Sequence, residues 1–436
     1  MPLTLKPATN LTGVITVPGD KSLSHRAVMF ASLAKEKSRI SDWLPAGDCW
    51  ATVEAMRALG AQIDVLSQDE TGAELVIHGV GLQGLKSPDK PINCRGSGTT
   101  MRLLAGIVAG LPLDVTLTGH EGLCRRPMQR VARPLRLMGA DVQTRDGRPP
   151  MRIRGGKLSG IDYEMPIASG QIKSAILLAG LFAEGETVVR QPGPARDHTE
   201  RLLQAQGVSL ASIGKGAIRL SPPQQPLRPL TLAIPGDFSS AAFPLIAALL
   251  VPNSHLKIES INVNSTRTGL LDVLQKMGAK ITLSNPREAA GEPLADLEVQ
   301  SSALRGVEVQ GDTVVRMIDE FPIFAVAATQ AQERTIVRDA AELRVKETDR
   351  IKATVNELRK MGAHLIPHPD GFEVHGPTPL KGAVVDSDGD HRLAMALSVA
   401  GLIAKGKTTV KNAGVIGDSY PGFTTMLKEI GAEVSE

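Results

Sequence analysis

Charged side chains that suit anion binding stand at the expected start of a helix near the amino end of the chain. Lys21, Ser22 and Arg26 follow the turn Pro18–Asp20, and Ser22 and Arg26 lie four residues apart, on one helix face. The first N–H groups of a helix lack intrahelical partners and carry partial positive charge, so they bind phosphate and carboxylate. An N-cap surrounded by solvated charges is the plain structural alternative.

Three further segments carry arginines or mixed charges at expected helix starts. Arg125 and Arg126 precede a helix expected to begin at Pro127, and arginine binds carboxylate or phosphate with two parallel hydrogen bonds. Lys346–Arg350 mixes both signs of charge, and so does Asp390–Arg392. Taken one at a time, each segment has a plain structural alternative: a solvated basic loop for Arg125–Arg126, a surface ion-pair cluster for Lys346–Arg350, and a capped helix with a surface arginine for Asp390–Arg392.

Two carboxylates, Asp319 and Glu320, stand among apolar residues in the segment Met317–Pro322. Asp319 is either an N-cap or a group that moves a proton. Because cationic helix starts occur in both halves of the chain, they predict one shared anion-binding cleft between two domains. The residues alone therefore indicate an enzyme that acts on small polyanionic substrates.

Composition narrows the classes of protein. The 436 residues are 42% hydrophobic and 22% charged, as in soluble globular proteins of two domains. A net charge of +3 and only 8 Phe, 2 Tyr and 2 Trp do not favour nucleic-acid binding. No apolar run approaches the ~18 residues of a membrane span, no signal peptide is visible, and three cysteines suggest a reducing cytoplasm. No metal-binding motif or nucleotide loop is recognisable, so the sequence gives no support for a metal or dinucleotide site.

A repeated phrase predicts the elements that position these side chains. A helix-like stretch that ends in glycine before a β-prone run occurs six times, 68 to 84 residues apart, at Gly60, Gly139, Gly207, Gly278, Gly362 and Gly431. Glycine ends a helix in the left-handed region without steric cost. The turn Val17–Asp20 recurs half a chain later as Ile234–Asp237. The repeats predict two halves of three units, each strand-helix-strand-helix-strand-strand, with helices inside and strands outside.

Eight segments, in order over nearly the whole chain, resemble those of one family. They are Pro18–Ala27, Gly96–Gly106, Arg125–Met128, Ala168–Ala175, Ala195–Glu200, Met317–Ile323, Lys346–Ile351 and Asp390–Ala396. In them the chain resembles the 5-enolpyruvylshikimate-3-phosphate synthases, or 3-phosphoshikimate 1-carboxyvinyltransferases. The resemblance implies a two-domain inside-out α/β barrel of the α+β type, each domain having three βαβαββ units around a pseudo-threefold axis. It implies one domain of residues 1–20 plus 236–436, another of 21–235, and an active site in the cleft between them.

The resemblance also implies a reaction. Phosphoenolpyruvate and shikimate 3-phosphate give 5-enolpyruvylshikimate 3-phosphate and phosphate, by addition of the 5-hydroxyl and then elimination, in the shikimate pathway of aromatic amino acid biosynthesis. No metal or organic cofactor is implied. The expected partners are these two substrates, without nucleic acid or membrane, and the expected enzyme is a cytoplasmic monomer.

Site residues carry over from the resemblance one by one. Asp319 is the expected base for the 5-hydroxyl, Glu347 the expected proton donor to the methylene, and Lys21 assists; sequence leaves open whether the two carboxylates share or exchange roles. Shikimate 3-phosphate is expected to contact Lys21, Ser22, Arg26, Ser169, Gln171, Arg196, Asp319 and Lys346. Phosphoenolpyruvate is expected to contact Lys21, Gly98, Arg126, Gln171, Arg350 and Arg392. Gly170 completes the set of substrate-binding residues.

The chain departs from the family pattern at three places. Arg95–Gly96 stands where Gly-Asn is usual, Asp418 where part of the family has lysine, and Gly170 where Ser or Ala is frequent. Gly98 leaves room for the inhibitor glyphosate. The departures leave open how tightly phosphoenolpyruvate and glyphosate bind.

Two other functions on the same scaffold compete with this interpretation. A UDP-N-acetylglucosamine enolpyruvyl transferase has Lys-Asn where this chain has Lys21–Ser22, and its cysteine stands five residues before the loop arginine, where this chain has Glu121. A non-catalytic anion-binding protein would have lost its acid and base, but Asp319 and Glu347 are both present. Both features favour the first assignment.

Overall fold

The structure, a computed structural model, describes residues 1–214 and 216–436. Contacts divide these residues into two compact units. Unit 1 comprises Met1–Pro18, Pro235–Arg287 and Pro293–Glu436, and unit 2 comprises Gly19–Ile234 and Glu288–Glu292. Each unit encloses a hydrophobic core of its own.

Unit 2 contains three four-stranded sheets within its described residues, and all three repeat one pattern. In sheet order the strands are β16 (Thr231–Ala233), β3 (Lys37–Trp43), β5 (Ala73–His78) and β4 (Gln62–Gln68); β6 (Ile92–Asn93), β7 (Asp114–Thr118), β9 (Arg148–Arg154) and β8 (Asp141–Arg145); and β11 (Asp162–Glu164), β13 (Thr187–Arg190), β15 (Ala217–Ser221) and β14 (Ser209–Ser212). In each sheet the first two strands are parallel and the last two form an antiparallel hairpin. A short parallel pair joins β10 (Leu158–Ser159) to β12 (Ala183–Glu184).

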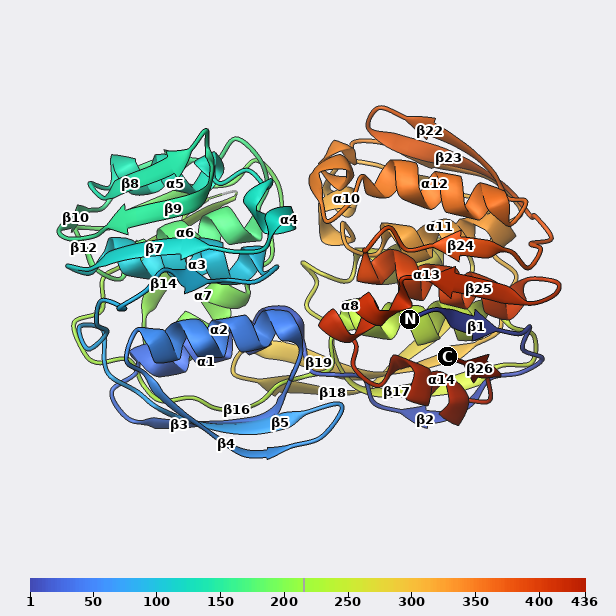
Figure 1. The fold of residues 1–436 in the computed structure, drawn as a ribbon, viewed down its shortest axis with the longest axis horizontal. Helices are drawn as coiled ribbons and strands as arrows, with labels where there is room; N and C mark the ends of the chain where they lie inside the picture. The colour runs from blue at the N-terminus through green and yellow to red at the C-terminus, as the bar shows by residue number, and fades with distance from the viewer. Residues whose placement is uncertain (215) are drawn as a thin grey trace. The chain divides into compact units, whose positions relative to one another are not determined.

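The helices of unit 2 pack against one another on the inner side of these sheets, and Figure 1 shows β3, β4 and β5 alongside α1 and α2. They are α1 (Lys21–Leu33), α2 (Gly47–Ala58), α3 (Gly98–Ala109), α4 (Glu121–Cys124), α5 (Gln129–Leu137), α6 (Gly170–Gly180) and α7 (His198–Ala205). Every residue of α1 from Leu23 onward is buried, and α3 contacts both α1 and α6. A Cβ atom at Gly106 would lie 2.2 Å from the Ala175 carbonyl oxygen, so glycine permits the close approach of α3 to α6.

Unit 1 repeats the same architecture. In sheet order its strands are β2 (Thr12–Ile15), β17 (His255–Asn262), β19 (Glu292–Gln300) and β18 (Lys280–Ala289); β20 (Glu308–Val309), β21 (Glu333–Val337), β23 (Gly371–Gly376) and β22 (His364–His368); and β24 (Val384–Asp386), β25 (Thr408–Lys411), β1 (Leu3–Leu5) and β26 (Val434–Ser435). Its helices are α8 (Phe238–Leu250), α9 (Gly269–Lys276), α10 (Asp312–Arg316), α11 (Phe321–Gln330), α12 (Arg350–Lys360), α13 (His391–Ile403) and α14 (Phe423–Glu429), with the 3-10 helices η1 (Ala341–Val345) and η2 (Ala413–Asp418). The three buried helices α8, α11 and α13 contact one another pairwise, which gives this unit a helical centre.

The predicted repeat is confirmed at the level of helices and strands. The segment β6-α3-β7-α5-β8-β9 has the expected order strand-helix-strand-helix-strand-strand, with the short α4 inserted. All six repeated glycines have positive φ angles, between +91° and +112°, directly after a helix. The left-handed helix exits that the sequence predicts are therefore present in every repeat.

One predicted helix start is wrong. α5 begins at Gln129 rather than at Pro127, and Arg125 instead follows the short helix α4. The backbone N–H groups of Met128 and Gln129 both donate to the Gly147 carbonyl oxygen. These bonds hold the chain at Met128 outside the helix, so the local sequence signal was overridden by a contact with the hairpin β8–β9.

The two units are joined by more than the turns that repeat in the sequence. The chain leaves unit 1 after Pro18 and returns at Pro235, and residues 288–292, at the tip of the hairpin β18–β19, are again counted with unit 2.

No helix in the described part of the chain is long and apolar enough to cross a membrane. The same residues contain no group of three or more His, Cys, Asp or Glu side chains able to hold a metal ion.

Candidate active site

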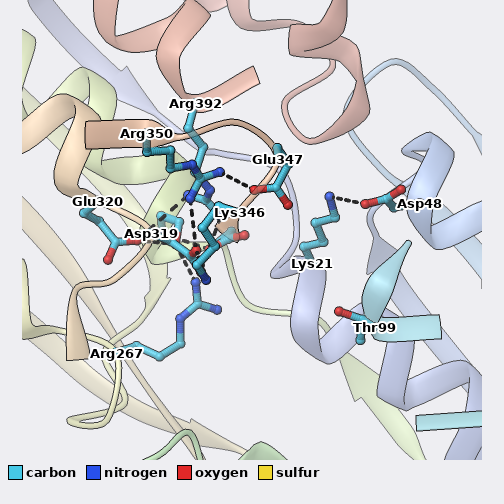
Figure 2. A network of polar contacts seen from close by, with 12 residues as sticks. Lys21, Asp48, Thr99, Arg267, Asp319, Glu320, Lys346, Glu347, Arg350 and Arg392 are labelled. Carbon is cyan, nitrogen blue, oxygen red and sulfur yellow. Dashed lines mark hydrogen bonds and ion pairs between the residues drawn. The ribbon is translucent and has the colours of Figure 1, made fainter. Parts of the chain in front are cut away.

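The start of α1 brings together the first predicted residues. Asp20 is the N-cap, and its carboxylate accepts the Leu23 N–H at 2.9 Å. Lys21, at the first helical position, makes an ion pair of 2.7 Å with Asp48 at the start of α2, and the Lys21 side chain keeps 17% of its surface exposed. Figure 2 shows this pair. Asp48 was not among the predicted site residues, because only the packing of α1 on α2 makes it a neighbour of Lys21.

Arg26 lies one turn further along α1 and is almost completely buried. Its Nε donates to Thr199 Oγ1 and its Nη2 to Ser174 Oγ, both at 2.8 Å, and its Nη1 donates to the Ser22 carbonyl oxygen at 3.0 Å. Burial lowers the pKa of Arg26 to about 10, against the opposing effect of the Glu200 carboxylate. The guanidinium therefore remains charged at neutral pH, in a fixed orientation beside Ser22.

The start of α6 contributes the next group to unit 2. Ser169 is the N-cap of α6, and its hydroxyl accepts the Ile172 N–H at 3.4 Å. A Cβ atom at Gly170 would lie 3.2 Å from Arg196 Cβ, so Arg196 is adjacent to this helix start. Ser174 Oγ, which binds Arg26, donates to the Gly170 carbonyl oxygen. The structure thus gathers the residues predicted for shikimate 3-phosphate in unit 2 around the first turns of α1 and α6.

A second group in unit 2 surrounds Gly98 at the first position of α3. A Cβ atom at Gly98 would lie 2.8 Å from Arg102 Nη1 and 3.2 Å from Arg126 Nη1. Arg102 Nη1 donates to Gln171 Oε1 at 2.5 Å, and Gln171 Nε2 donates to Thr99 Oγ1 at 2.9 Å. The predicted residues Gly98, Arg126 and Gln171 therefore lie together, and Arg102 joins them. Sequence reasoning missed Arg102, although its spacing of four residues from Gly98 places both on one helix face.

In unit 1 three cations converge on the carboxylate of Asp319. Lys346 Nζ lies 3.5 Å and Arg350 Nη1 3.4 Å from Asp319 Oδ1, and Arg392 Nη2 lies 3.9 Å from Asp319 Oδ2. Figure 2 shows these side chains directed toward Asp319. Glu347 lies beside them, 2.8 Å from Arg350 Nη2, with 34% of its side chain exposed. All five predicted residues of this unit are therefore in one ion-pair network.

Arg350 is held in the network by buried carboxylates. Its Nε lies 2.7 Å from Asp390 Oδ2, and both residues are almost completely buried. Burial alone lowers the pKa of Arg350, but the carboxylates of Asp390 and Glu347 outweigh burial and raise it. In return the Arg350 charge keeps the pKa of Asp390 below its usual value, although burial acts in the opposite direction. Asp390 also caps α13, accepting the Arg392 N–H at 2.9 Å, so one carboxylate positions two predicted arginines.

Of the two roles that the sequence left open for Asp319, the structure excludes the N-cap. α11 begins at Phe321 and Glu320 occupies the N-cap position, so Asp319 lies outside the helix with its carboxylate among the cations. Glu320 is buried and accepts a hydrogen bond from Ser239 Oγ. Arg267 donates to the same hydroxyl at 2.7 Å. These contacts of Glu320, the neighbour of Asp319, were not predicted, because Ser239 and Arg267 come from segments far away in the chain.

Two of the three departures from the family pattern, Arg95–Gly96 and Gly170, lie near the Gly98 loop, since Gln171, the neighbour of Gly170, donates to Thr99 Oγ1. Arg95 adopts a left-handed conformation and makes an ion pair of 2.5 Å with Glu54. A Cβ atom at Gly96 would meet only Asp48 Oδ1, at 3.5 Å. Asp418 ends η2 and is exposed.

Comparisons with known proteins all point to one family. A family model described as EPSP synthase (3-phosphoshikimate 1-carboxyvinyltransferase) matches residues 5–427. A 3-phosphoshikimate 1-carboxyvinyltransferase from Thermodesulfovibrio yellowstonii is 49% identical over 427 residues, or 97% of this chain and 98% of the relative. One from Bacillus cereus is 46% identical over 430 residues, or 98% of this chain and 99% of the relative.

A solved structure extends the likeness to the fold. The structure of an EPSP synthase from Acinetobacter baumannii matches with a TM-score of 0.88, at 41% sequence identity and with 100% of each chain covered. This match confirms the predicted two-domain α/β fold. Of the three functions that the sequence left in competition, these findings favour the transfer of an enolpyruvyl group from phosphoenolpyruvate to shikimate 3-phosphate. The chain belongs to the EPSP synthase family, and it is a 3-phosphoshikimate 1-carboxyvinyltransferase of the shikimate pathway.

Proposed function

We propose that the polar groups of both units act together on the two substrates of enolpyruvyl transfer. In unit 2, Ser22, Arg26, Ser169, Gly170, Gln171 and Arg196 bind shikimate 3-phosphate, together with Asp319 and Lys346 of unit 1. Phosphoenolpyruvate is bound by Gly98, Arg126, Gln171, Arg350 and Arg392. Lys21 contacts both substrates. The proposed domains are residues 1–20 with 236–436, and residues 21–235; they differ from the two compact units by one or two residues at each turn and by residues 288–292.

The charges of the substrates support this division. Each substrate carries a phosphate and a carboxylate, which together amount to roughly five to six negative charges at neutral pH. The predicted binding residues include lysines and arginines that already hold carboxylates, as in the pair of Lys21 with Asp48. These carboxylates orient the cations before the substrates bind. Substrate anions then replace or join the carboxylates as partners of the cations.

The single observation that carries the catalytic assignment is the convergence of Lys346, Arg350 and Arg392 on Asp319. A carboxylate held among cations is a fixed acceptor for the proton of the 5-hydroxyl. As that proton moves to Asp319, the oxygen adds to C2 of phosphoenolpyruvate and Glu347 gives a proton to the methylene carbon. A tetrahedral adduct results. The phosphate then leaves and takes up the proton held by Asp319, while a proton of the methyl group returns to Glu347, which gives the enolpyruvyl ether and restores both carboxyl groups.

Phosphate release tests this assignment. The wild-type protein should release phosphate only when both substrates are present, and omission of either should abolish it. Asp319→Asn should lower kcat by about 10²- to 10⁴-fold, because the proton acceptor is lost. Asp272→Asn is the matched control, since Asp272 also pairs with an arginine of unit 1, Arg316 at 2.7 Å, but is 42% exposed and outside the network. Near-normal turnover by Asp319→Asn would contradict its role as the base.

We also propose where the enzyme works and how it assembles. The odd number of cysteines in the sequence is typical of proteins in a reducing compartment, so the enzyme works in the cytoplasm. The family resemblance implies a monomer. Light scattering of the purified protein at assay concentrations checks the oligomeric state, and a dimer mass would contradict it.

A further inference from the structure

The tip of the hairpin β18–β19 is built into unit 2. Ala289 and Ala290 pack against the hydrophobic core of that unit, and Arg201 Nη1 donates to the Gly291 carbonyl oxygen at 2.5 Å. Glu292 follows and has no exposed surface. A buried carboxylate is strongly destabilising unless charged or polar groups bind it, so its partners decide what it does in the fold.

The carboxylate of Glu292 binds the first residue of α7. His198 Nδ1 lies 2.8 Å from Glu292 Oε1, and both side chains have an exposure of 0%. Because a carboxylate only accepts hydrogen bonds, Nδ1 is the donor. The bond fixes the ring of His198 and, with it, the position of the first turn of α7.

The next residue of α7 leads directly to the predicted substrate site. Thr199 Oγ1 accepts the Nε–H of Arg26 at 2.8 Å and lies 2.7 Å from Ser174 Oγ, which accepts the Nη2–H of Arg26 at 2.8 Å. Thr199 is itself completely buried. The orientation of the Arg26 guanidinium therefore depends on where the start of α7 is held.

The pKa of Arg26 also depends on nearby carboxylates, and Glu292 is one of them. Burial is the main influence on the pKa of Arg26 and lowers it, while the carboxylates of Glu200, Asp20 and Glu292 all oppose that shift. Glu200 in turn makes a buried ion pair of 2.6 Å with Lys173, whose Nζ also donates to the Ala195 carbonyl oxygen. Both sides of the loop that carries Arg196 are thus anchored by buried charged residues.

We propose that Glu292 is a positioning residue for the shikimate 3-phosphate site: through His198 it fixes the start of α7 and thereby the orientation of Arg26. The proposal rests on the assignment of Arg26 to shikimate 3-phosphate. Glu292 itself contacts neither substrate and has no role in binding phosphoenolpyruvate. Loss of its carboxylate should therefore weaken the binding of shikimate 3-phosphate and leave the binding of phosphoenolpyruvate unchanged.

The strand that carries Glu292 offers a matched control. Glu298, also on β19, contacts His255 Nε2 at the same distance of 2.8 Å, but the two side chains are 45% and 53% exposed. In the full-length enzyme, Glu292→Met removes the acceptor and should raise the KM for shikimate 3-phosphate about tenfold, the effect of one charge-assisted hydrogen bond, and leave the KM for phosphoenolpyruvate within about twofold. Glu298→Met should leave both values unchanged. Calorimetric titration with shikimate 3-phosphate alone should show the same loss of affinity.

Variants of His198 and Arg26 make each outcome decisive. In His198→Asn the amide N–H takes the place of Nδ1–H and should keep normal affinity, whereas His198→Phe should behave as Glu292→Met does. These variants serve equally if Glu292→Met does not fold. If Arg26→Ala weakens binding of shikimate 3-phosphate but Glu292→Met and His198→Phe do not, the positioning role is refuted. If both KM values rise together in Glu292→Met, the residue is only structural. If Arg26→Ala has no effect, the assignment of Arg26 fails instead.

Discussion

The clearest quantitative prediction concerns Gly98→Ala at the start of α3. The added Cβ atom would lie 2.8 Å from Arg102 Nη1, whereas unstrained contacts between such atoms need about 3.5 Å. The Arg102 guanidinium must therefore move by roughly 0.7 Å, and a shift directed away from the Gln171 oxygen lengthens their contact from 2.5 Å to about 3.2 Å. A hydrogen bond to a charged group contributes about 1.5–3 kcal/mol. Losing about half of this energy should raise the KM for phosphoenolpyruvate by roughly 3- to 13-fold.

Steady-state phosphate release, with phosphoenolpyruvate varied at saturating shikimate 3-phosphate, measures this effect. The melting temperature should stay near that of the wild type, because the atoms that must move are the ends of flexible side chains. Gly96→Ala is the matched control two residues earlier, where the new Cβ atom would meet only Asp48 Oδ1, at 3.5 Å. A KM for phosphoenolpyruvate that stays within about twofold in Gly98→Ala would refute the argument. An equal change in Gly96→Ala would also refute it.

Three further changes test the packing and charge of each unit. Asp390→Asn removes the buried negative charge that pairs with Arg350. Urea titrations at pH 7 should show a free energy of unfolding lower by about 3 kcal/mol, and a decrease of less than about 1 kcal/mol would contradict this. Burial lowers the pKa of His25 from 6.5 to about 3. Between these two pH values the imidazole takes up a proton in the unfolded chain but not in the folded protein, so the free energy of unfolding falls as the pH drops through that window. His25→Asn should remove about 2 kcal/mol of the stability difference between pH 7 and pH 5, and an unchanged difference would exclude His25 as its cause. Gly106→Ala should reduce stability by about 3 kcal/mol, because its Cβ atom would overlap the Ala175 oxygen, and an unchanged melting temperature would show that α3 moves away without strain.

The repeated features of the fold were predictable because they depend on local sequence. Asp20 and Asp237, from the recurring turn, cap two helices of equal length, α1 and α8, each of 13 residues. A cap and a left-handed glycine are each determined by a few neighbouring residues, so six copies of a phrase identify six repeats. The family resemblance supplied the remaining description of the fold.

The supporting contacts of the site were not predictable from spacing. Arg102 stands in a recognised segment, but its partner Gln171 is 69 residues away in the chain. Asp390 caps a helix, which is one of the roles that the sequence allowed, but its carboxylate also holds Arg350 from α12. The sequence could not decide between the two roles of Asp319, because its carboxylate contacts cations from two other helices. Such contacts arise from tertiary packing, which short-range patterns do not encode.

The hairpin β18–β19 determines how the enzyme can be divided. A fragment of residues 19–234 would carry all three sheets of unit 2 but would lack residues 288–292, which are counted with that unit. In such a fragment the imidazole of His198 would lose the carboxylate that it binds in the interior, and the core would lose Ala289 and Ala290. Cutting the gene at the two repeated turns therefore does not yield a complete unit. Complementation between separately expressed halves would require the hairpin of one fragment to enter the other, so assembly and folding of unit 2 would become a single, concentration-dependent event.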